Sequence, residues 1–432
     1  MKSVAIKLSA VGLAAIAVTT TACRGKQDSA PAAATSGGAA IRLEVAGRSS
    51  AAASVAAFGK TVAAVWTATA DDTSDIYITT SADTGVTFAP PVRVNDVAGD
   101  ARASGEQAAR VLIAPGNVIH VAWPARQEGR SVIRYASSKD GGRTFSPAIT
   151  VAGEALNGAR GWHALALGYD GSVHAVWLDG RNAGPMSHGA GHVHGGPAGS
   201  AAPPKPSGGP RQDIFHASWQ AGGARAEHMV QANVCFCCKT SVATSGENVY
   251  VAWRHIYPGS LRDIAVARSA DNGATFAPPT RVSEDGWKID ACPDDGPALA
   301  ADGHGGIHIV WPTLVPGETP RKGIFYSTLA ENAFAPRIRL DAGDSDPAHP
   351  QIAADEHLNT AAVWDERVGG GRRIVFRTVV DKVPQPAQIF TGESAAYPTV
   401  AGNEGFWIVL WTVQGADGRS TIEGRRIATP SH

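Results

Sequence analysis

The amino-acid sequence predicts an all-β protein, a β-propeller of four-stranded blades. Three observations support this fold class: a short apolar strand that ends in tryptophan recurs seven times, a further strand follows each copy, and turn-forming residues are abundant. The chain of 432 residues contains 49 glycines and 27 prolines, as expected for many short strands joined by turns. Regular repetition of one unit is typical of propellers, in which neighbouring units bury each other's apolar faces.

The tryptophan strand sets the period of the chain. Its seven copies read TVAAVW, VIHVAW, SVHAVW, NVYVAW, GIHIVW, NTAAVW and FWIVLW, and they end at Trp66, Trp123, Trp177, Trp253, Trp311, Trp364 and Trp411. Successive tryptophans lie 57, 54, 76, 58, 53 and 47 residues apart, so the third unit carries about 20 extra residues. We expect each indole to fill the space between two blades.

The two ends of the repeat array predict how the ring closes. A third strand follows every tryptophan strand, and a weaker fourth strand follows six of the seven copies. The last copy has no fourth strand, whereas IRLEV at 41–45 stands alone at the start. A ring closed by its own N-terminal strand accounts for both features and leaves no free sheet edge. Seven repeats predict seven blades, with six as the alternative if one end repeat is degenerate.

Three turns after the third strand share the pattern Ser-x-Asp-x-Gly-x-Thr-Phe, with their aspartates at Asp83, Asp140 and Asp271. The spacing suits a hairpin in which the carboxylate accepts backbone N–H bonds, glycine takes a positive φ, and phenylalanine packs beneath the turn. These turns resemble the Asp-box, or BNR, repeat of the sialidase-like superfamily, and the resemblance covers nearly all of the chain after residue 40. It implies a propeller but no particular activity, because this turn occurs on propellers of many functions.

The N-terminus has the pattern of a bacterial lipoprotein signal. Lys2 and Lys7 give a positive start, an apolar stretch follows at 11–18, and Thr-Thr-Ala-Cys resembles a lipobox. Residues 1–22 are therefore predicted to be a signal peptide and 23–40 a flexible tether lipidated at Cys23, with the propeller at 41–432. Ordinary secretion with an incidental cysteine is the alternative. The prediction places the protein in the bacterial cell envelope, held by lipid at the outer membrane or periplasmic face.

The charge balance argues against a nucleic-acid partner. The chain has 38 Lys plus Arg and 39 Asp plus Glu, a net charge of -1, with no basic stripe to neutralise phosphates. We expect a membrane contact through the lipid anchor and a metal or small ligand as partner. The sequence identifies neither a protein partner nor an oligomeric state.

One face of the predicted ring gathers soft metal ligands. In a four-stranded blade, the loops that lead into the first strand and those that follow the tryptophan strand lie on the same face. Thiolate, thioether and imidazole groups in these loops suit Cu(I), Cu(II) or Zn(II), and copper is favoured. A His/Gly/Pro-rich insertion at about 181–212 supplies part of the set. The candidate ligands are Cys235, Cys237, Cys238, Cys292, Met186, His188, His192 and His194.

Disulfides are the alternative for the same cysteines. Four cysteines in an oxidising compartment usually pair, with three possible connectivities. A bridge from the cysteines of unit four to Cys292 would tie two blades together, and the protein would then be a protein-interaction scaffold. The segments CFCC, WRHIYPGSLRDIAVARSADNGATF and DGWKIDACPDDGPALAAD also resemble a group of sialidase-like bacterial envelope lipoproteins. That resemblance implies that the cysteines of units four and five form one site.

The resemblance to sialidases implies a third function, exo-sialidase-like glycoside hydrolysis. Members of that family hold a substrate carboxylate with three arginines, use a tyrosine activated by glutamate as nucleophile, and use an aspartate as acid and base. The candidates on the same face are Tyr397 with Glu393, and Arg160, Arg254 and Arg367. The Phe/Tyr-Arg-Ile-Pro segment that supplies the first arginine in the family is missing from this sequence.

Overall fold

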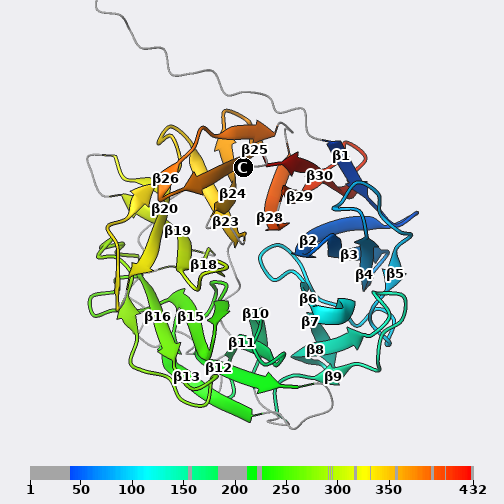
Figure 1. Ribbon diagram of the computed structural model, residues 1–432, viewed down its shortest axis with the longest axis horizontal. Coiled ribbons are helices and arrows are strands. Elements are labelled where there is room, and N and C mark those ends of the chain that lie inside the picture. Colours follow the sequence, from blue (N-terminus) through cyan, green and yellow to red (C-terminus); the bar gives the residue numbers. More distant parts are fainter. Residues whose placement is uncertain are drawn as a thin grey trace, which may run out of the picture. The chain divides into compact units, whose positions relative to one another are not determined.

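Seven antiparallel sheets surround a central axis, as Figure 1 shows. The computed structural model describes residues 39–153, 158–182, 212–220, 226–289, 291, 293, 295–315, 319–330, 332–355, 359–390, 394–403 and 405–429. The prediction of seven four-stranded blades is confirmed, and the six-bladed alternative is wrong. The predicted signal peptide, Cys23 and insertion residues 183–211 lie outside the described residues. No helix within the described ranges has the length and apolar character needed to cross a membrane.

The first four blades follow the order of the chain. Blade one contains β2 (Ser49–Phe58), β3 (Thr61–Ala70), β4 (Thr73–Ser81) and β5 (Val92–Arg93). Blade two contains β6 (Arg110–Ala114), β7 (Val118–Gln127), β8 (Arg130–Ser138) and β9 (Ile149–Thr150). Blade three contains β10 (Arg160–Leu167), β11 (Val173–Asp179), β12 (Gln212–Trp219) and β13 (Ala226–Val234). Blade four contains β14 (Ser241–Ser245), β15 (Asn248–Arg254), β16 (Ile264–Ser269) and β17 (Thr280–Arg281).

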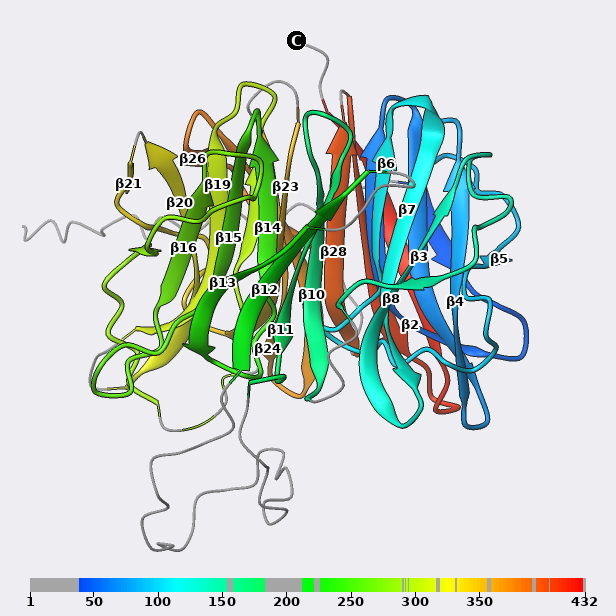
Figure 2. The ribbon, with the colours of Figure 1, turned by 90° about the horizontal axis from the view of Figure 1, so that it is seen from below.

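The last three blades complete the ring. Blade five contains β18 (Ala298–Ala301), β19 (Ile307–Val315), β20 (Arg321–Ala330), β21 (Ala333–Phe334) and β22 (Ile338–Arg339). Blade six contains β23 (Asp346–Ala354), β24 (Thr360–Val368), β25 (Gly371–Val380), β26 (Val383–Pro384) and β27 (Gln388–Phe390). Blade seven contains β28 (Ala395–Asn403), β29 (Phe406–Gln414), β30 (Ser420–Ala428) and β1 (Ala39–Leu43). The first strands of the blades lie nearest the axis, and Figure 2 shows the strands running between the two faces of the ring.

Strand β1 closes blade seven, as the sequence predicts, but it spans Ala39–Leu43 and not the predicted residues 41–45. It pairs antiparallel with β30, and Ile41 lies opposite Gly424. Ile41 packs in one apolar cluster with Phe406 and Leu410 of the same blade. Glycine is required opposite it, because a Cβ at residue 424 would lie 2.5 Å from the side chain of Leu410. The N-terminal strand is therefore the fourth strand of the last blade and contributes to its core.

The tryptophan of each second strand packs between two blades. All seven indoles are buried, with 0–1% of each residue exposed. Trp123 of blade two lies in one cluster with Val65 and Ile78 of blade one. Trp66 of blade one lies in another cluster with Phe406 of blade seven. The predicted role of the tryptophan series in the core is thus confirmed, and each indole joins its blade to the preceding one.

The aspartate turns form the predicted hydrogen bonds. The backbone N–H of Thr87 donates to Asp83 Oδ1 at 2.9 Å, and its hydroxyl donates to Oδ2 at 2.6 Å. The N–H of Gly85, where φ is 82°, donates to Ser81 Oγ at 2.9 Å. Equivalent bonds occur around Asp140 and Asp271. Hydrogen bonds from serine and threonine side chains lower the pKa values of Asp83 and Asp271 to about 2, so these turns remain charged at neutral pH.

Replacing Ile41 with alanine tests closure by the N-terminal strand. Loss of this buried side chain should lower the free energy of unfolding by about 2–5 kcal/mol. The neighbouring side chain of Arg42 is 61% exposed, and Arg42→Ala should change stability by less than about 0.5 kcal/mol. Denaturant unfolding of both variants measures the difference. Equal, small effects would contradict closure of the ring by β1.

Candidate metal centre

Three cysteines gather in the loop that joins blade three to blade four. Cys235, Cys237 and Cys238 follow β13, and 2%, 6% and 2% of these residues are exposed. The sulfur of Cys235 lies 3.8 Å from that of Cys237 and 3.6 Å from that of Cys238. All three sulfurs lie within 4.8 Å of one another, and within the described ranges no other group of three His, Cys, Asp or Glu residues comes so close.

The sulfur separations match those of thiolates around one ion. Zinc binds thiolate sulfur at about 2.3 Å, so neighbouring sulfurs at the corners of a tetrahedron lie about 3.8 Å apart. The separations of 3.6 and 3.8 Å agree with this edge length. The spacing of the three sulfurs is therefore compatible with ligation of one ion.

The three cysteines of the loop differ in oxidation state. Cys237 is disulfide-bonded, whereas Cys235 and Cys238 are free thiols. The remaining cysteines of the chain, Cys23 and Cys292, lie outside the described residues. The loop therefore combines the two alternatives drawn from the sequence, metal ligation and disulfide formation. Two sulfurs are available as ligands, and the third becomes available only when its disulfide is reduced.

Two buried arginines make the surroundings of the thiols positive. Arg254 donates hydrogen bonds to the carbonyls of Asp295 at 3.1 Å, Arg262 at 2.7 Å and Pro312 at 2.8 Å. Arg262 is 9% exposed, and its Nε and Nη1 have no hydrogen-bond partner among the described residues. The donors of Arg254 are therefore occupied, while two donor nitrogens of Arg262 have no partner in the described part of the chain.

The environment separates the two free thiols electrostatically. A hydrogen bond from Cys238 lowers the pKa of Cys235 to about 6; burial opposes this shift, and the charges of Arg262 and Arg254 support it. Burial, together with the neighbouring Cys235, raises the pKa of Cys238 well above its usual range. Cys235 is thus the thiol that most readily becomes a thiolate at neutral pH.

Four of the first strands carry an irregularity near the axis that the sequence did not predict. Ala52, Trp162, His349 and Tyr397 have φ values of 54–56°, and the register shifts around each of them. Such bulges redirect side chains, and a left-handed non-glycine residue costs about 1–3 kcal/mol. Trp162 packs against the cysteine cluster together with Phe236. No residue pattern signals these positions, since the conformation is imposed by the surrounding fold.

A buried ion pair lies next to the cysteine loop. Lys239 follows Cys238, and its Nζ donates to Glu106 Oε1 at 2.7 Å and to the carbonyl of Pro350 at 2.8 Å. The side chains of Lys239 and Glu106 are 2% and 4% exposed. Burial raises the pKa of Glu106, although the charge of Lys239 opposes this shift. The pair links blade four with the loop before blade two and with blade six.

His349 and Tyr397 form the other side of this polar region. Their ring centroids lie 4.3 Å apart, and Nδ1 of His349 lies 2.7 Å from Asp365 Oδ2. The same oxygen accepts the backbone N–H of Tyr397 at 2.8 Å. Burial lowers the pKa of His349, but the hydrogen bond and charge of Asp365, with Glu106 and Asp295, more than offset burial and raise it overall. A buried carboxylate thus orients the imidazole.

Two of the three arginines proposed for a sialidase site have separate partners. Arg160 pairs with Asp179 at 3.2 Å, and the donors of Arg254 are taken by carbonyls. Arg367 lies near the end of β24, and its exposed side chain makes no hydrogen bond or ion pair with another described residue. Glu393, Met186, His188, His192 and His194 lie outside the described residues.

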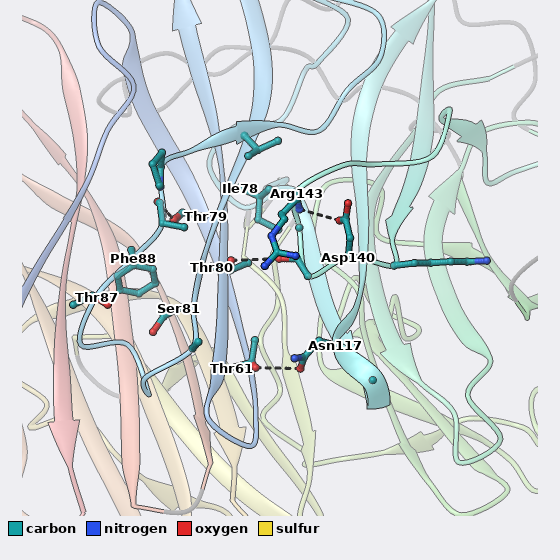
Figure 3. A pocket seen from close by; sticks show the side chains of 18 residues that line it. Thr61, Ile78, Thr79, Thr80, Ser81, Thr87, Phe88, Asn117, Asp140 and Arg143 are labelled. Atoms are coloured by element: carbon teal, nitrogen blue, oxygen red, sulfur yellow. Dashed lines mark hydrogen bonds between the residues drawn. The ribbon is translucent and has the colours of Figure 1, made fainter.

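A separate groove of about 650 Å³ lies between blades one and two. Figure 3 shows its lining, which includes Thr80, Asn117, Asp140 and Arg143. Thr61 donates a hydrogen bond to Asn117 at 3.1 Å across the two blades. The groove is lined by two aspartate turns and contains none of the predicted metal ligands. We therefore assign its residues to the structural contact between the two blades.

Comparisons with known proteins support the fold. No family model matches the chain, and no curated protein matches its sequence. The chain is similar to an α-L-arabinanase of Penicillium chrysogenum complexed with arabinobiose, with a TM-score of 0.50, 11% identity, and coverage of 73% of this chain and 92% of that chain. It is also similar to a PL25 ulvan lyase, with a TM-score of 0.51, 9% identity, and coverage of 88% and 95%. At these identities the similarity shows the propeller fold alone.

Lys239→Met should strongly destabilise the protein, because it leaves the buried Glu106 carboxylate without its cation. We expect a loss of about 3–5 kcal/mol in the free energy of unfolding at pH 7. Combining it with Glu106→Gln should recover part of this loss, since no uncompensated charge remains. Urea unfolding of both single variants and the double variant measures the coupling. Additive effects of the two substitutions would contradict the ion pair.

Replacing His349 tests its pairing with Asp365. The pKa of His349 is raised, so its contribution should be complete below about pH 6.5 and lost as the pH rises through the folded-state pKa. His349→Asn, a residue that tolerates a positive φ, should cost about 1.5–3 kcal/mol at pH 6 and less at pH 9. Unfolding at both pH values measures the change. A cost that does not vary with pH would contradict a charged imidazole in this contact.

Proposed function

We propose that this chain is an envelope-anchored lipoprotein whose propeller binds a soft metal ion, with copper favoured, through the cysteines between blades three and four. The observation that carries the proposal is the cluster of three buried sulfurs within 4.8 Å of one another. Their separations are those expected for thiolates that share one ion. The lipid anchor at Cys23 and the additional ligands Met186, His188, His192, His194 and Cys292 are proposed from the sequence.

The surroundings of the thiols support a ligand role. Buried polar groups in native proteins are normally hydrogen-bonded, and an unused donor calls for an explanation. Arg262 has two buried donors without a partner among the described residues, next to Cys235. An anionic thiolate–metal unit would compensate this positive charge, whereas a cluster of neutral thiols and disulfides would not. The same loop is held by Lys239, which limits movement of its sulfurs.

A second candidate function is glycoside hydrolysis, and it is favoured by the position of Tyr397 on β28 beside His349. Tyr397 has a φ of 54° and contacts His349, which pairs with the buried Asp365. A tyrosine beside an imidazole that a buried carboxylate orients is compatible with nucleophilic catalysis. A fluorogenic sialoside would test this function directly. Cleavage that is lost in Tyr397→Phe would support the hydrolase, and no cleavage would exclude conventional sialidase activity.

The metal proposal predicts stoichiometric metal in the protein lacking residues 1–23. Purified from its native envelope, this form should carry about one equivalent of copper or zinc by mass spectrometry. Cys235→Ser and Cys238→Ser should each lose most of that metal, because each removes a thiolate. Met229 of β13 is 52% exposed, so Met229→Ser serves as the control for loss of a sulfur-containing side chain at the surface. Unchanged metal content in both cysteine variants would overturn the proposal.

A further inference from the structure

We propose that the disulfide of Cys237 determines which metal this centre holds. While the disulfide is intact, Cys235 and Cys238 form a two-thiolate site for Cu(I). Once it is reduced, the centre gains a third thiolate and also accepts Zn(II). This inference rests on the proposed function, and it specifies the ion and the control of that same site.

The number of free thiols limits which metal ion the oxidised loop can bind. Cys235 and Cys238 are the free cysteines among the described residues, and their sulfurs lie 3.6 Å apart. Zinc sites in proteins use four ligands, or three protein ligands with a water. The two free thiols of the described residues fall short of either set by themselves. Cu(I), in contrast, is a soft ion that thiolates select and that needs fewer ligands. The oxidised loop therefore favours the monovalent ion.

Charge gives a second, independent argument. Two thiolates with Cu(I) carry a net charge of −1, whereas two thiolates with Zn(II) are neutral. Arg262 presents two buried donors without a partner among the described residues, and Arg254 adds a second positive charge beside the thiols. A buried cation is stabilised by a compensating anion and not by a neutral unit. The arginines therefore favour the anionic copper complex.

Reduction changes the ligand set in one step. A dithiol breaks the S–S bond of Cys237, transfers two electrons and two protons to the two sulfurs, and leaves as its own disulfide. The sulfur of Cys237 then becomes a thiol 3.8 Å from that of Cys235. Zinc binding displaces the thiol protons. The thiolates of Cys235, Cys237 and Cys238 with Zn(II) carry a net charge of −1. This is the same compensation for the arginines that Cu(I) achieves with the thiolates of Cys235 and Cys238.

The test uses the protein lacking residues 1–23, prepared without reductant and handled without oxygen. One sample is treated with dithiothreitol and desalted, and the other is left untreated. Each is titrated with Cu(I) in competition with bathocuproine disulfonate, and with Zn(II) in competition with a chromogenic chelator. We expect the untreated protein to bind about one equivalent of Cu(I) and no Zn(II). The reduced protein should bind about one equivalent of Zn(II) as well.

Arg262→Gln tests the charge argument, with the exposed Arg268→Gln of β16 as the matched control. Loss of one buried charge beside the complex should weaken Cu(I) binding by about tenfold or more, and the control should leave it unchanged. Circular dichroism shows whether each variant folds. Arg262→Lys keeps the charge and should retain more of the Cu(I) affinity than Arg262→Gln.

The outcomes separate this inference from the proposed function. Equal Zn(II) affinity before and after reduction would overturn control by the disulfide and leave metal binding intact. Equal Cu(I) affinity in folded Arg262→Gln and wild-type protein would overturn the charge argument. Failure of both forms to bind either ion would overturn the proposed function itself. The comparison of untreated and reduced wild-type protein needs no variant, so it holds even if Arg262→Gln does not fold.

Discussion

The buried ammonium of Lys239 is the interaction on which the candidate site depends. It joins Glu106, which is 133 residues away and belongs to the loop before blade two, to the carbonyl of Pro350 in blade six. One side chain from the start of blade four thus ties together segments from across the ring. Gly296 makes this approach possible, because a Cβ there would lie 2.3 Å from the carbonyl oxygen of Lys239. Since a buried charge without its partner is strongly destabilising, the pair fixes this loop in place.

The ion pair between Lys239 and Glu106 also restrains the neighbouring cysteine loop. Cys238 precedes Lys239, and Thr240, the next residue, donates from its hydroxyl to the carbonyl of Trp162 at 2.6 Å. The sulfurs are therefore held between an ion pair and a backbone contact to blade three. A soft ion would bind such a cluster with little reorganisation, which is the main advantage of a preformed site. The bulge at Trp162 has a comparable effect, because its strained conformation places an aromatic side chain against the cysteines.

The sequence predicted the ring more completely than the site. The tryptophan strands and the aspartate turns are local patterns that recur along the chain, so the sequence predicts the blades. The unpaired strand at 41–45 predicts how the ring closes. The grouping of Cys235, Cys237 and Cys238 was also visible, since the three lie within four residues. The partners of Lys239, the unused donors of Arg262 and the left-handed His349 and Tyr397 were not. Each depends on contacts between distant blades, and nothing in the local sequence marks a positive φ at histidine or tyrosine.

X-ray absorption of the metal-loaded protein tests the central claim most directly. It measures which atoms surround the ion and at what distance, independently of affinity or activity. A cysteine-based centre predicts a first shell dominated by sulfur at about 2.3 Å at the copper or zinc edge. A shell of nitrogen and oxygen at about 2.0 Å, with no sulfur, would place the ion at other residues and contradict the account.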